Sequence, residues 1–155
     1  MNFRFTIFTV EGVLKMKRDW SLLRVLLAHF ESESAERFFE SCEPKWIEGQ
    51  LLPDFLKAKD EAERFKTVVA EHLKQLLERN LVEGVKVDRY ADNRLYVVFT
   101  NPRLTSDGYD LLEAMRSDSV WKCIRQRASE LGVGLTVASV QALARSVVRS
   151  LVGDG

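Results

Sequence analysis

The chain has 155 residues, of which 46% are hydrophobic and 30% charged, so its composition is that of an ordinary globular protein with one domain and a real core. Its 23 basic and 23 acidic side chains give a net charge of zero, which argues against strong nucleic-acid binding, because such affinity comes mainly from phosphate neutralisation. No apolar run is long enough to cross a membrane and the two cysteines lack CxxC spacing, so we expect a cytoplasmic protein with reduced thiols and no membrane partner.

The charges are unevenly distributed along this neutral chain. Residues 31–48 are acidic, with six glutamates against two bases: Glu31, Glu33, Glu36, Glu40, Glu43 and Glu48 against Arg37 and Lys45. Residues 121–151 are basic, with five bases against Glu130: Lys122, Arg125, Arg127, Arg145 and Arg149. A dipolar protein of this kind can present a basic surface although its total charge is zero.

Residues 1–15 form an N-terminal extension with two readings. Apolar and polar residues alternate loosely here, which indicates an edge strand. Alternatively, the segment is a disordered extension that precedes a natural start at Met16. Both readings stay open.

Three helices are predicted before the middle of the chain. Asp19 can cap a helix whose apolar face is Leu22, Leu23, Leu26, Leu27 and Phe30. Ser34 can cap a short helix through Phe38 and Phe39. Pro53 suits the first turn of a helix, so we expect Pro53–Lys59 to be a separate, supporting helix.

The stretch from Phe65 to Met115 carries the strongest fold signal. Apolar residues at helical spacing predict a helix over Phe65–Arg79, which ends at Asn80. Alternating residues predict strands at Val82–Val87 and Leu95–Thr100 around a turn at 91–93, and Thr105 begins the next helix. Helix, hairpin and helix in this order predict a winged-helix core within residues 16–116, in an α+β, mostly helical fold.

Residues 117–155 are predicted to be a C-terminal helical appendage. Ser117 or Ser119 can cap one helix, and Thr136 can cap the last. The last helix has an apolar stripe that either packs on the core or forms a homodimer interface: Val137, Val140, Ala144, Val147, Val148 and Leu151.

The sequence shows no sign of catalysis, metal or cofactor binding. His29 and His72 are far apart and lie on apolar helix faces, where packing is the commoner role. There is no GxSxG motif and no phosphate-binding glycine loop. We therefore expect a protein that is not an enzyme.

Duplex DNA is the partner that the predicted winged helix favours. Exposed side chains of the helix Phe65–Arg79 could enter the major groove: Lys66, Lys74, Gln75 and Arg79. The hairpin bases Lys86, Arg89 and Arg94 could touch phosphates or the minor groove. The alternative is an ordinary solvated helix, because Glu71 and Glu78 share the face and repel phosphates.

Several runs resemble a bacterial and prophage family catalogued as domain of unknown function 2513. The matching runs are Met16–Arg24, His72–Val82, Pro102–Leu112 and Ala114–Trp121, the clearest being Arg103-Leu104-Thr105 followed by Gly108. The resemblance implies a winged helix similar to the YjcQ-like proteins of Bacillus, in a cytoplasmic protein often carried by phages, with no known catalytic residue. Residues 1–15 precede the family's usual start, and the segment Ser32–Pro53 is longer and more acidic than expected.

Two functions follow as expectations. The first is a non-enzymatic winged-helix protein of phage or prophage type that binds DNA as a transcriptional regulator. The second is a phage-encoded inhibitor that docks on a host defence complex, as small acidic proteins do when their carboxylates take the place of phosphates. A mixed or negative surface over the helix Phe65–Arg79 and the hairpin would favour the second.

Overall fold

A computed structural model describes residues 18–153 and shows six helices and one antiparallel hairpin in this part of the chain. The elements are α1 (Trp20–Glu31), α2 (Ala35–Glu40), α3 (Leu52–Glu78), β1 (Val82–Arg89), β2 (Leu95–Leu104), α4 (Ser106–Arg116), α5 (Asp118–Leu131) and α6 (Val137–Val152). The fold is therefore α+β and mostly helical, as predicted. Residues 1–15, expected to be an edge strand or an added segment, lie outside the described residues.

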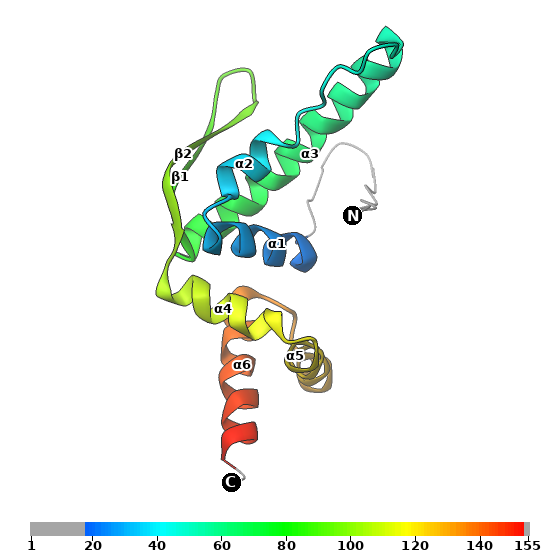
Figure 1. Cartoon of the computed structure of the whole chain (residues 1–155). Helices are drawn as coiled ribbons and strands as arrows, with labels where there is room; N and C mark the ends of the chain where they lie inside the picture. The colour runs from blue at the N-terminus through cyan, green and yellow to red at the C-terminus, as the bar shows by residue number, and fades with distance from the viewer. Residues whose placement is uncertain (1–17, 154–155) are drawn as a thin grey trace.

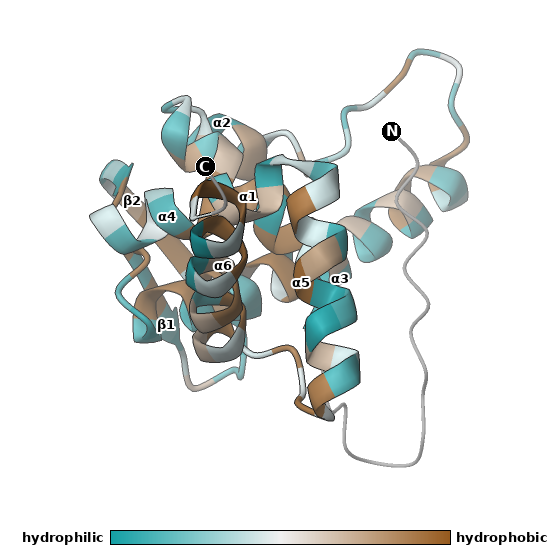
Figure 2. Cartoon of the chain, turned by 90° about the horizontal axis from the view of Figure 1, so that it is seen from below, coloured by the Kyte–Doolittle hydropathy of each residue, from teal (hydrophilic) through white to brown (hydrophobic). Residues whose placement is uncertain are grey.

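Helix α1 lies between α3 and α4, and α5 and α6 pack against α4 and against each other (Figure 1). The first half of α3 and the tip of the hairpin project from one side of this core, and α6 projects from the other (Figure 1). Hydrophobic and hydrophilic residues alternate around α1 and α6, as expected for helices with one buried face (Figure 2). The buried cluster extends without interruption from α1 to α6, so the C-terminal helices share the core of the rest.

The long helix α3 corrects the prediction of two helices. The proposed supporting helix Pro53–Lys59 and the helix Phe65–Arg79 are parts of one helix, Leu52–Glu78, about 40 Å long. The intervening residues 61–64 are good helix formers, and Asp60 pairs with Arg64 one turn later at 2.8 Å. Nothing in this segment ends a helix, so the helix continues.

The end of α3 was predicted correctly. Asn80 adopts a left-handed conformation with φ of 53°. The Leu81 amide donates to the Leu76 carbonyl at 2.9 Å, and the Asn80 amide donates to the Leu77 carbonyl at 3.0 Å. These two hydrogen bonds are those of a Schellman motif, which returns the chain toward the core at Leu81.

The hairpin is longer than predicted. Its strands continue to Arg89 and Leu104, and the turn at 91–93 is where the sequence placed it. The pairing is irregular between Glu83 and Val85. At this bulge Gly84 has φ of +77°, and a Cβ there would lie 2.4 Å from the Asn101 carbonyl oxygen. The site therefore accepts only glycine without rearrangement.

The start of α4 is fixed against the end of α3. The Thr105 hydroxyl accepts from the Gly108 amide at 3.1 Å and donates to the Asn80 carbonyl at 2.6 Å. A Cβ on Gly108 would lie 2.0 Å from the Leu81 carbonyl oxygen. The Thr105 to Gly108 spacing, part of the clearest matching run, thus gives a capped helix that approaches the neighbouring backbone closely.

Three of the other predicted side-chain caps are present, and the one predicted at Ser34 is not. The Asp19, Ser117 and Thr136 side chains accept backbone hydrogen bonds at the starts of α1, α5 and α6. Ser34 instead contacts His29, with Oγ and Nδ1 2.7 Å apart. Over residues 18–153, no helix has the length and hydropathy needed to cross a membrane.

Candidate functional site

The predicted DNA-binding elements, α3 and the hairpin, lie side by side. Arg89 on β1 joins them, because its Nη2 lies 2.8 Å from Oε1 of Glu71 on α3. The same guanidinium donates from Nη1 to the Asn93 carbonyl and side-chain oxygens. Arg89 is therefore engaged within the protein.

Three other bases of this surface, Lys66, Lys86 and Arg94, also have acidic partners. Lys66 lies 2.5 Å from Glu43 and its ammonium sits 4.9 Å from the Phe39 ring centroid. On the hairpin, Lys86 pairs with Asp88 at 3.2 Å and Arg94 approaches Asp92 at 3.9 Å. Each of these bases therefore has a carboxylate within 4 Å.

The exposed stripe of α3 beside the hairpin has a mixed charge. Thr67, Glu71, Lys74 and Glu78 follow one another at helical spacing on this side. Lys74 forms no ion pair with any residue from 18 to 153. One free lysine between two glutamates neutralises few phosphates, so this face is poorly suited to DNA.

Gln75 and Arg79, the remaining predicted residues, belong to a different surface. Gln75 Oε1 accepts from Arg18 Nε at 2.9 Å. Arg79 follows Gln75 by about one helical turn and is therefore near Arg18. Partial burial, and then the positive charge of Arg79, lower the pKa of the Arg18 guanidinium. Two basic side chains, Arg18 and Arg79, therefore lie where the end of α3 meets the start of α1.

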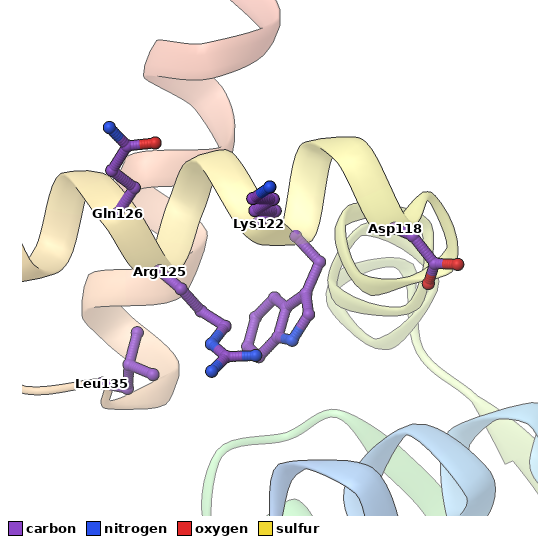
Figure 3. A pocket seen from close by; sticks show the side chains of 6 residues that line it. Asp118, Lys122, Arg125, Gln126 and Leu135 are labelled. Atoms are coloured by element: carbon purple, nitrogen blue, oxygen red, sulfur yellow. The ribbon is translucent and has the colours of Figure 1, made fainter.

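Aromatic contacts connect Arg18 with α5. The Arg18 guanidinium carbon lies 5.5 Å from the Trp20 ring centroid, and the Trp20 and Trp121 rings are 5.5 Å apart with planes inclined at 50°. Trp121 lines a pocket of about 690 Å³ together with Lys122 and Arg125. Figure 3 shows Arg125 extending from α5 on the side that faces α1.

We call Arg18, Arg79, Lys122 and Arg125 the basic band. Among the described residues, none of these four pairs with a carboxylate. Asp118 lines the same pocket but lies 3.3 Å from Arg24. The sequence had indicated a basic flank that includes Lys122 and Arg125. Arg18 was missed, because its position beside Arg79 and Trp20 depends on tertiary packing.

The histidines have structural roles, as expected. His72 is fully buried; its Nε2 accepts from the Asp19 amide at 2.9 Å, so Nδ1 carries the proton and donates to the Val68 carbonyl at 2.7 Å. Burial is the main cause that lowers the pKa of His72. No cluster of potential metal ligands occurs among residues 18–153. Cys42 and Cys123 are free thiols, half-buried and exposed respectively.

A second surface is apolar and lies at the projecting end of α3. Five large side chains from the preceding loop and the first turns of the helix are more than half exposed: Trp46, Ile47, Leu51, Leu52 and Leu56. The Trp46 ring packs edge-on against Phe55, with centroids 5.1 Å apart. We call these five residues the arm cluster. The sequence predicts a loop or short strand around Trp46 and Ile47 and a helix over Pro53–Lys59, but does not indicate an exposed apolar surface here.

The predicted interface stripe on α6 divides into two parts. Val137, Val140 and Val147 are buried in the chain's own core, and Ala144 is half-buried. Val148 and Leu151 are 50% and 68% exposed. Only this second part is accessible to a partner.

Comparison with known proteins agrees with the family resemblance. A curated relative, an uncharacterized protein of Haemophilus influenzae (strain ATCC 51907 / DSM 11121 / KW20 / Rd), is 26% identical over 137 residues, which cover 88% of this chain and 99% of that protein. No solved structure matches the chain significantly. The family model described as "Hypothetical protein (DUF2513)" matches residues 17–134. The chain therefore belongs to the DUF2513 family of hypothetical proteins.

Proposed function

We propose that the chain is a non-enzymatic winged-helix protein that binds duplex DNA, acting as a transcriptional regulator of the phage or prophage type. The observation that carries this proposal is the basic band. Arg18, Arg79, Lys122 and Arg125 present charge that no described carboxylate compensates. Uncompensated bases along one surface are what phosphate neutralisation requires.

The winged-helix assignment rests on the order of elements. Three helices precede a hairpin, and the hairpin lies against the third helix through Arg89 and Glu71. In the proposed mode, DNA contacts come from the C-terminal end of α3 and from α5. The exposed stripe of α3 and the hairpin contribute less, because Lys74 lies between Glu71 and Glu78 and the hairpin bases are paired with acids.

Salt-dependent binding to a random duplex tests the proposal. The double variant Lys122→Ala, Arg125→Ala removes two phosphate contacts, so the slope of log affinity against log salt falls by about 1.8. The control variant Lys86→Ala, Arg94→Ala removes the same charge from the hairpin and leaves the slope nearly unchanged. Absence of binding at low salt contradicts DNA binding. If the slope falls in the hairpin variant and not in the Lys122→Ala, Arg125→Ala variant, the hairpin, and not the basic band, contacts DNA.

Two observations favour a second candidate, an inhibitor that docks on a host defence complex: the mixed charge of the α3 stripe and the hairpin, and the arm cluster. The five exposed apolar residues of the arm cluster adjoin the acidic segment 31–48, and large exposed apolar patches mark protein interfaces. Leu52→Asp with Leu56→Asp then abolishes capture of a defence nuclease subunit that the wild type retains. Equal capture by wild type and variant argues against this candidate.

A further inference from the structure

A groove between α4 and α6 is unconnected with the basic band. It has a volume of about 780 Å³, and its apolar lining includes Leu111, Ala114, Val120, Ala144 and Val148. Both walls are helices, so the groove has the shape that receives another helix.

The groove continues into an exposed apolar strip on α6. Val148, Leu151 and Val152 are 50%, 68% and 74% exposed. They lie three and four residues apart, which places them on one side of the helix. A helix with this strip gains free energy when a partner covers it.

The walls of the groove carry opposite charges. Asp110 and Glu113 line it from α4, whereas Arg145 and Arg149 line it from α6. Neither arginine pairs with a carboxylate among residues 18–153, and Glu113 lies 3.3 Å from Arg116. Such a surface complements itself, because a two-fold axis brings the acidic wall of one copy to the basic wall of the other.

We propose that a second copy of this chain occupies the groove, with the two α6 helices antiparallel at a two-fold axis. Val148 and Leu151 of each copy then cover the same residues of the other, and Arg149 of each copy faces Glu113 of the other. The 16 residues of α6 give a contact about 24 Å long. This length is modest, so association in the micromolar range is expected.

Sedimentation of the whole chain without DNA tests this proposal separately from DNA binding. The wild type dimerises as its concentration rises through the micromolar range. Val148→Asp with Leu151→Asp gives a monomer with unchanged helical content. The matched control, Leu131→Asp with Val133→Asp, alters equally exposed apolar residues at the end of α5 and still dimerises.

Charge reversal tests the register of the two copies. Arg149→Glu weakens the dimer at least tenfold, and adding Glu113→Arg restores it. A wild type that stays monomeric to about 500 μM, well above the expected range, overturns the proposal. The proposal is also overturned if Leu52→Asp with Leu56→Asp abolishes the dimer while Val148→Asp with Leu151→Asp leaves it intact. That result would assign the arm cluster as the dimer interface.

Discussion

At the residue scale, His72 is the most constrained polar group of the core. Its ring joins the residue before α1 to the middle of α3, through the Asp19 amide and the Val68 carbonyl. Both hydrogen bonds require the neutral imidazole with its proton on Nδ1. Protonation at Nε2 would set an N–H against the Asp19 N–H, so a charged ring loses this bond as well as its solvation.

This arrangement predicts acid sensitivity. Because the folded pKa of His72 is lowered, the unfolded chain takes up the proton first as pH falls below about 6.5, and stability decreases there. Thermal unfolding between pH 7.5 and 5 therefore shows a falling midpoint, and His72→Gln reduces the slope. Burial also lowers the pKa of His29, so His29 contributes to the pH dependence in the same direction. The variant His29→Gln therefore retains the part of the pH dependence that is due to His72. If the unfolding midpoint of His72→Gln depends on pH as steeply as that of the wild type, His72 is not the cause of the acid sensitivity.

Gly108 gives a second prediction at this scale. In Gly108→Ala the new methyl meets the Leu81 carbonyl oxygen, part of the backbone, so α4 must move from the end of α3. We expect a loss of at least about 2 kcal/mol in unfolding free energy, measured by chemical denaturation. Gly134→Ala is the control, because a Cβ there meets nothing within 4 Å. Equal stability of the two variants would show that the contact is easily relieved.

At the scale of elements, helix starts and stops could be read from the sequence. Asp19, Asn80, Thr105 and Thr136 act through hydrogen bonds a few residues away, so local patterns reveal them. The union of two predicted helices into α3 was missed, because Pro53 was taken to start a short helix. Proline at the first turn starts a helix of any length, and only a later breaker ends it.

The two halves of α3 differ in packing and should differ in stability. Val69, Ala70, Leu73 and Leu76 are buried in the second half, whereas the residues from Leu52 to Arg64 are exposed or half-buried. Helical stability comes mainly from such packing. Hydrogen exchange is therefore predicted to be fast in residues 55–64 and slow in residues 69–77. Equal protection of both halves would mean that a partner covers the arm cluster.

At the scale of the whole molecule, the neutral total charge hides a separation of charged surfaces. Lys66 on α3 and the hairpin bases Lys86, Arg89 and Arg94 pair with acids, whereas the four bases of the basic band pair with none among the described residues. The sequence showed that residues 121–151 are basic, but could not show that Arg18 and Arg79 lie close together. Contacts between residues so far apart in the chain arise only when α1, α3 and α5 pack together.

The three tryptophans permit the most direct test of the central claim, that the basic band holds DNA. Trp20 and Trp121 lie beside the band, and Trp46 lies in the arm cluster. Each has one indole N–H, which gives a separate NMR signal that single Trp→Phe variants assign. When a duplex is titrated at low salt, the account predicts that the Trp20 and Trp121 signals shift and the Trp46 signal stays in place. A shift of Trp46 alone, or of none of the three, would contradict it.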